Sequence, residues 1–112
     1  MENNCITIFE DALNELRVDY SKTIVKEKES VILSIKSLVN TVFDQIYAEE
    51  FYVEKAKDLG FAIVFEGQDL EIHHEEDEPL MQLIGMSSAI NFQQSNDTVR
   101  LSLLYIGLLE DI

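Results

Sequence analysis

The spacing of apolar residues changes once along the chain, near Gly60, and this change constrains the fold more than any other feature of the sequence. Before it, apolar residues recur every three or four positions, first at Ile6, Phe9, Leu13, Leu16 and Tyr20. That period indicates an amphipathic helix from about Cys5 to Asp19. After Gly60 the period falls to about two and β-branched and aromatic residues become frequent, which is typical of β-strands. The sequence therefore predicts helices followed by strands.

A second and longer helix is predicted from Ser30 to Leu59. Ser30 suits the N-cap position, and Gly60 suits the left-handed residue that ends many helices. Thirty residues of helix would be about 45 Å long, which exceeds the width expected of a compact chain of this size. We therefore expect either a break near Asn40 and Thr41 or a homodimer formed through the helices.

The first predicted strand covers 61–66 and is followed by Gly67 and Gln68, which suit a two-residue turn. A return strand from Asp69 would place Leu70 opposite Phe65 on an apolar face, with acidic residues on the other face. Together these segments form a first expected hairpin.

A second hairpin is predicted near the end of the chain, with Asn96 and Asp97 as its turn. This turn would place Phe92 opposite Leu101 and keep the apolar residues of both strands on one face. Two further secondary-structure predictions concern the residues of this hairpin and those just before it. A C-terminal helix capped by Asp97 could replace the last strand, because leucines from Leu101 onward also fit a helical stripe. A short strand could form around Met81.

The predicted class is α+β, in the order α-α-β-β-β-β. Two N-terminal helices, the second one long, would cover one face of a mostly antiparallel sheet of about four strands. With 112 residues and no linker, the chain is expected to be a single acidic domain over 1–112.

The charge balance is strongly acidic and restricts the partners. The chain holds 22 Asp and Glu against 8 Lys and Arg, a net charge of −14. Such a field repels nucleic acids and anionic membranes, so neither is an expected direct partner. No apolar run is long enough for a membrane helix, no signal peptide is evident, and Cys5 is the single cysteine, which together favour a cytoplasmic protein.

No motif for catalysis, metal binding or cofactor binding is found. His73 and His74 lie in an acidic segment, but adjacent residues of a strand point to opposite faces and cannot both bind one ion. Cys5 has no nucleophile signature around it, and the glycines form no phosphate-binding loop. We therefore expect no enzyme, no metal and no cofactor.

The acidic half of the sequence is the candidate binding surface. The 42 residues between Lys57 and Arg100 contain no positive side chain. In the predicted return strand, Asp69, Glu71, His73 and Glu75 would face the same way at intervals of about 6.7 Å. The candidate contact residues for a basic protein partner are Glu66, Asp69, Glu71, Glu75, Glu76, Asp77 and Glu78.

The sequence thus favours a small acidic inhibitor or regulator, in its sharpest form a DNA mimic that occupies the basic groove of a nucleic-acid-binding protein. In architecture alone, the expected fold is similar to uracil-DNA-glycosylase inhibitors and small acidic mimics of double-stranded DNA. The alternative is an immunity or chaperone-like interaction protein that binds through an apolar helix surface including Tyr47 and Phe51.

Overall fold

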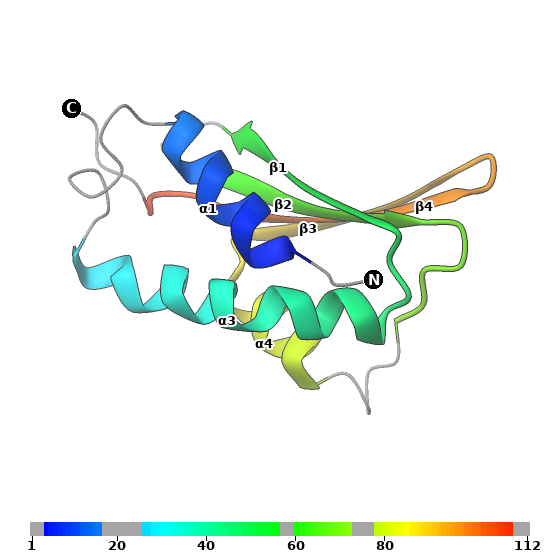
Figure 1. The fold of residues 1–112 in the computed structure, drawn as a ribbon, viewed down its shortest axis with the longest axis horizontal. Coiled ribbons are helices and arrows are strands. Elements are labelled where there is room, and N and C mark those ends of the chain that lie inside the picture. Colours follow the sequence, from blue (N-terminus) through cyan, green and yellow to red (C-terminus); the bar gives the residue numbers. More distant parts are fainter. Residues whose placement is uncertain (1–3, 17–25, 57–59, 73–77, 109–112) are drawn as a thin grey trace.

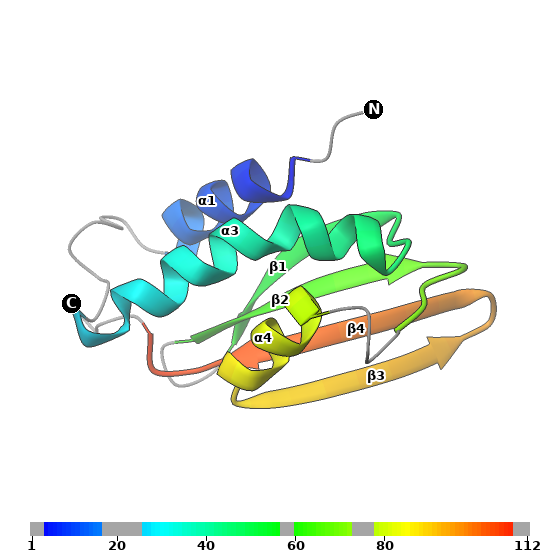
Figure 2. The ribbon, with the colours of Figure 1, turned by 90° about the horizontal axis from the view of Figure 1, so that it is seen from below.

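A computed structural model describes residues 4–16, 26–56, 60–72 and 78–108. Its elements, in chain order, are α1 (Cys5–Leu16), a 3-10 turn η1 (Lys26–Lys28), α3 (Glu29–Gln45), β1 (Glu50–Ala56), β2 (Gly60–Gly67), α4 (Glu78–Met86), β3 (Ala89–Ser95) and β4 (Thr98–Tyr105). The strands form one antiparallel sheet in the order β1-β2-β4-β3. The helices lie on one face of it (Figures 1 and 2). The expected α+β class is confirmed, with α4 as an additional helix between β2 and β3.

The core lies between the sheet and the two N-terminal helices, as the sequence predicts. Phe61 and Ile63 of β2 are fully buried together with Phe9 of α1 and Ile35 of α3. The rings of Phe9 and Phe61 meet edge to face with their centroids 5.4 Å apart, a preferred aromatic geometry. Leu13, Val42, Ile46, Phe65 and Leu70 are also buried, and Ile72 packs against them partly buried. No described helix combines the length and the apolar content that a bilayer crossing requires.

The prediction that the second helix reaches Leu59 is wrong, because α3 ends at Gln45. The chain then turns through Tyr47, whose φ of 59° is left-handed, and enters β1. The short apolar run 51–53 suits either a helix or a strand, and periodicity cannot separate the two over so few residues. With 17 residues, α3 does not overhang the domain. The length mismatch that suggested a homodimer through the helices is therefore absent.

Gly60 does not end a helix but begins β2, where it is buried. A Cβ atom at this position would lie 2.2 Å from the carbonyl oxygen of Tyr105 in β4. Glycine is thus required by the close approach of two strands rather than by a helix cap.

The first strand prediction is confirmed, but its predicted partner is wrong. β2 pairs with β1 on one side and with β4 on the other, rather than with a strand starting at Asp69. After Gln68 the chain leaves the sheet, and the Glu71 N–H donates to the Ile46 carbonyl at 2.9 Å. β1 occupies the edge of β2 that the predicted return strand would have used. Residues 69–72 therefore do not join the sheet.

The second hairpin is confirmed together with its register. Phe92 lies opposite Leu101 and Ile90 opposite Leu103, across a turn at Asn96 and Asp97. The alternative C-terminal helix is therefore wrong for 98–105. The short strand around Met81 is also wrong, because 78–86 form α4.

Candidate functional site

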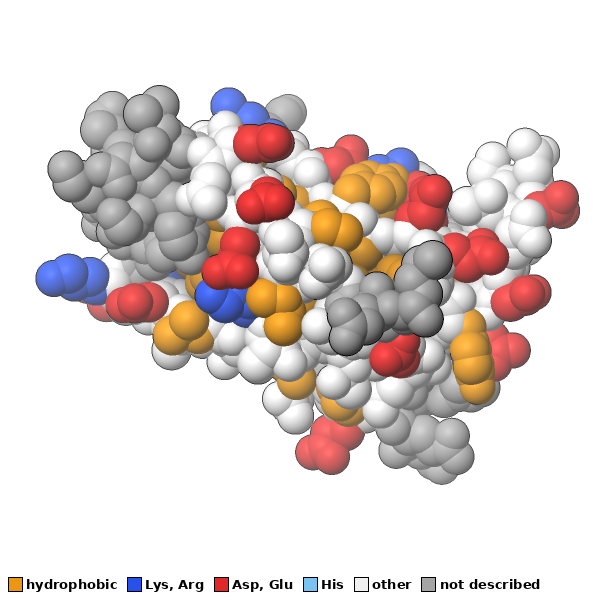
Figure 3. Space-filling view, viewed as in Figure 1, with side chains coloured by type: hydrophobic (Ala, Val, Ile, Leu, Met, Phe, Trp, Pro, Cys, Tyr) orange, Lys and Arg blue, Asp and Glu red, His pale blue; other side chains and the backbone are white. Residues whose placement is uncertain are grey.

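The densest group of carboxylates lies at the end of the molecule opposite the described lysines of η1 and α3. The described lysines near α3 lie in η1 and in the first half of that helix, at Lys26, Lys28 and Lys36. Carboxylates gather at the opposite end, where α3 and β2 finish and β1 and β4 begin (Figures 1 and 3). We call this region the acidic end and define it by Glu49, Glu50, Glu66, Asp69, Glu71 and Asp97.

Backbone hydrogen bonds hold the segments of the acidic end together. The Glu49 N–H donates to the Glu66 carbonyl at 2.7 Å, and the Gln68 N–H donates to Glu49 Oε1 at 2.9 Å. In the sheet, Glu50 of β1 lies directly opposite Glu66 of β2. These contacts fix carboxylates from separate parts of the chain at one site.

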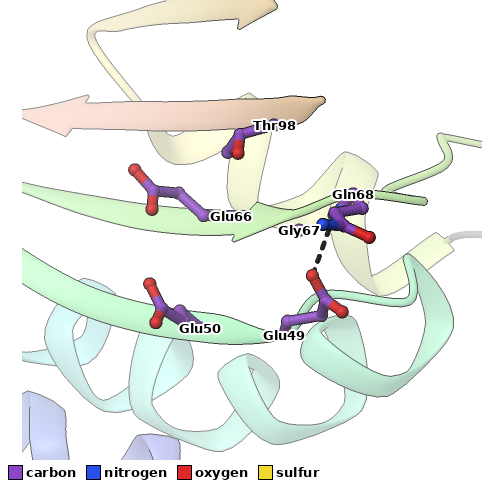
Figure 4. A pocket seen from close by; sticks show the side chains of 6 residues that line it. All are labelled: Glu49, Glu50, Glu66, Gly67, Gln68 and Thr98. Atoms are coloured by element: carbon purple, nitrogen blue, oxygen red, sulfur yellow. Dashed lines mark hydrogen bonds between the residues drawn. The ribbon is translucent and has the colours of Figure 1, made fainter. Parts of the chain in front are cut away.

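An open hollow of about 360 Å³ lies at the acidic end. Figure 4 shows the carboxylates of Glu50 and Glu66 extending in the same direction from neighbouring strands, while Glu49 turns toward the backbone of Gln68. The hollow is lined by Glu49, Glu50, Glu66, Gly67, Gln68 and Thr98. Adjacent carboxylates directly opposite each other in a sheet repel, so this arrangement costs stability and favours a cationic neighbour.

The nearest cation among the described residues, Arg100, extends across the sheet toward β1. Its guanidinium forms an ion pair with Glu54, and its carbon Cζ lies 5.7 Å from the centre of the Tyr52 ring. The Arg100 Nε lies 3.7 Å from Glu66 Oε2. Because β2 lies between β4 and β1, the Arg100 side chain crosses the outer face of β2. Arg100 therefore pairs with Glu54 of β1 and with Glu66 of the acidic end.

Tyr52 completes this cluster on the outer face of the sheet. Its hydroxyl donates to Glu66 Oε2 at 2.5 Å. Burial, together with the hydrogen bond to Glu66, raises the pKa of Tyr52 to about 12. The Glu66 carboxylate therefore contacts both Tyr52 and Arg100. It links neighbouring strands of the sheet and also contributes charge to the acidic end.

Three further carboxylates of the acidic end lack an ion pair within the described part of the chain. Glu50, Asp69 and Asp97 form no ion pair with any residue that the structure describes. The end of α3 lies beside them, and its last turn has no basic side chain to offset the negative pole of the helix. The field at this end is consequently negative.

The structure brings together three of the residues predicted to bind a partner. Glu66, Asp69 and Glu71 belong to the acidic end, whereas Glu78 is exposed in the first turn of α4, where it complements the helix N-terminus. Glu75, Glu76 and Asp77 lie outside the described residues. The evenly spaced row along a strand is wrong for Asp69 and Glu71, because these residues follow β2 and are not in the sheet.

Sequence reasoning missed Glu49 and Glu50, which it placed in the long helix, and Asp97, which it treated as a turn residue or a helix cap. The available signal was the pair of consecutive glutamates just ahead of the β-favouring segment 51–53. Recognising a strand there would have placed both glutamates at the edge of the sheet.

The described residues contain no group of three or more His, Cys, Asp or Glu side chains arranged to hold a metal ion. His73 and His74 lie outside them. Cys5 is 1% exposed, and burial, with the nearby Asp44 charge, raises the pKa of its thiol to about 12. A protonated, enclosed thiol is a poor nucleophile, so Cys5 packs the core. No protein family, curated protein or solved structure matches this chain.

Proposed function

We propose that this protein is a binding protein without catalytic activity that places its acidic end on a basic surface of another protein. The observation that carries the proposal is the gathering of six carboxylates at one end, where Arg100 pairs with Glu66 while Glu50, Asp69 and Asp97 form no ion pair with a described residue. A concentrated negative field accelerates association with a positively charged partner and makes the complex sensitive to salt.

The finer form of the proposal is a DNA mimic that occupies the basic groove of a nucleic-acid-binding protein. Such grooves hold Lys and Arg side chains positioned for phosphates. Support comes from the density of carboxylates rather than from a regular row, because Asp69 and Glu71 do not continue a strand. Loss of bound DNA from a partner is the property that separates mimicry from ordinary charge attraction.

The test compares two triple variants that remove the same amount of charge at different places. The first, Glu50→Gln with Asp69→Asn and Asp97→Asn, neutralises exposed members of the acidic end. The control neutralises exposed carboxylates elsewhere, by Asp11→Asn, Glu15→Gln and Glu27→Gln. Binding to a labelled oligo-arginine peptide is followed by fluorescence anisotropy at low and high salt, and circular dichroism checks the fold of each variant.

The parent and the control should bind the peptide alike at low salt, and the acidic-end variant should bind it about tenfold more weakly, which corresponds to ~1.4 kcal/mol. High salt should weaken the parent strongly. Equal affinities for the two variants would overturn a localised site. The mimic is tested separately, by whether the parent displaces duplex DNA from basic DNA-binding proteins while the acidic-end variant does not.

Less supports the alternative of an immunity or chaperone-like protein that binds through an apolar helix surface. The exposed large apolar residues of the helices are Ile8, Leu33 and Met81, and each lies on a different helix. Phe51 is buried in β1, while Tyr47 is 60% exposed in the turn before β1. A complex that resists high salt and is lost on Tyr47→Ala would favour this alternative.

A further inference from the structure

β3 is an edge strand without the usual protection against pairing. Each of its seven residues is exposed, and none carries a charge. Exposed strand edges present unpaired N–H and C=O groups, and natural proteins usually guard them with charges, proline or a covering element. Figure 2 shows β3 at the margin of the sheet, with none of the described helices above it. The backbone of this edge is therefore open to another strand.

The side chains of β3 strengthen this conclusion. Ile90 and Phe92 lie on the same face as their cross-strand neighbours Leu103 and Leu101, which are fully buried. Ile90 is nevertheless 49% exposed and Phe92 52% exposed. The inner face of the sheet thus continues beyond the helix layer as an uncovered apolar strip on β3.

We propose that β3 pairs antiparallel with β3 of a second copy of this chain, joining two sheets into one continuous sheet. A two-fold axis through Asn91 would place Ile90 of each copy directly opposite Phe92 of the other. Residues opposite each other point to the same face, so the four apolar side chains would meet on the inner face. A register centred on Ile90 or on Phe92 would instead pair one of these side chains with a polar residue.

The pairing of Ile90 with Phe92 makes this edge complementary to itself, and charge at the edge does not oppose a second copy as its occupant. Two molecules of net charge −14 repel over most of their surfaces, but β3 offers a contact without a carboxylate on either side. Antiparallel pairing also points the two acidic ends in opposite directions, because the acidic end lies where β4 begins and β3 finishes. The opposite edge strand, β1, carries Glu50, Glu54 and Lys55, so it does not offer an uncharged contact.

The first test is the mass of the full chain in solution as a function of concentration, by light scattering and sedimentation equilibrium. The parent should form a dimer. Phe92→Lys should raise the dimer dissociation constant about tenfold or more, because each dimer loses two apolar pairs and gains two edge lysines. Leu33→Lys is the matched control, since Leu33 is 53% exposed but lies on α3, and it should leave the dimer unchanged.

The second test measures the register of the two β3 strands by disulfide crosslinking, so its readout is a gain of covalent dimer rather than a loss of binding. Asn91→Cys would place two thiols directly opposite each other at a Cα separation of about 4.5–5.5 Å, within the range of a disulfide. Gln93→Cys is the control on the same face, with its two copies four residues out of register and about 13 Å apart. Oxidation should link Asn91→Cys into dimers and leave Gln93→Cys largely monomeric, and Cys5 is too buried to interfere.

A chain that stays monomeric at every concentration would overturn the proposal. So would a dimer that survives Phe92→Lys, or one that is lost with Leu33→Lys instead, since the interface would then lie elsewhere. Equal crosslinking at positions 91 and 93 would overturn the register centred on Asn91. These outcomes are independent of whether the acidic end binds a basic protein.

Discussion

The two edge strands of the sheet differ in cover and in charge. β1 lies beneath α1, its Phe51 is buried, and it carries Glu50, Glu54 and Lys55. β3 has no charged residue, and its Phe92 occupies the same row of the sheet half exposed. The comparison shows that the inner face of one sheet can be covered by a helix at one edge strand and exposed to solvent at the other. Whether a side chain of this cross-strand row is buried therefore depends on whether a helix lies over its strand.

The largest expected effect comes from truncating the two phenylalanines of this row. Phe51→Ala should lower the free energy of unfolding by ~3–5 kcal/mol, because it leaves a cavity in the core. Phe92→Ala should lower it by less than about 1 kcal/mol, as half-exposed sites do. Urea denaturation at two protein concentrations separates the stability of the single chain from that of a dimer. Similar losses at both positions would mean that β3 is covered.

A smaller effect is expected from the two outward-facing glutamates of β1. Glu54→Gln removes the ion pair with Arg100 and should cost ~0.2–1 kcal/mol, since both side chains are partly exposed. Glu50→Gln relieves repulsion from Glu66 and should be neutral or slightly stabilising. The difference between the variants should shrink in high salt. A difference that salt leaves unchanged would show that Glu54 acts by packing rather than by charge.

An effect that appears only at high pH concerns Tyr52, the residue that links β1 to Glu66 on the outer face. Its pKa is raised from 10.0 to about 12, so between these pH values the folded chain keeps a proton that the unfolded chain has lost. The contribution of Tyr52 is complete below pH 10, and the free energy of unfolding falls as pH rises toward 12.

Tyr52→Phe should make this fall shallower, measured by denaturation across the same pH window. Tyr47→Phe is the control because Tyr47 is 60% exposed and lies outside the cluster with Glu66. A slope that Tyr52→Phe leaves as steep as that of the parent would contradict the buried, hydrogen-bonded state of the Tyr52 hydroxyl. Burial also raises the pKa of Cys5 and Tyr105, but those contributions are common to the parent and both variants.

Local patterns in the sequence were sufficient for the second hairpin and for much of the core. Residues 96 and 97 suit a two-residue turn, and that turn sets the register that places Phe92 opposite Leu101. The spacing of Phe9 and Leu13 likewise identified the buried stripe of α1. These predictions hold because each depends only on residues that are neighbours in the sequence.

The sequence by itself determined the α+β class, the net charge and the faces of the strands it identified, because periodicity and composition are local properties. Only the tertiary structure decided that 50–56 form a strand, that Asp69 leaves the sheet, and which carboxylates gather at the acidic end. The physical reason is competition for the edge of β2: β1 and the segment after Gln68 could each pair with it, and packing beneath α1 favours β1. The same packing leaves β3 uncovered, which no pattern within its seven residues could have indicated.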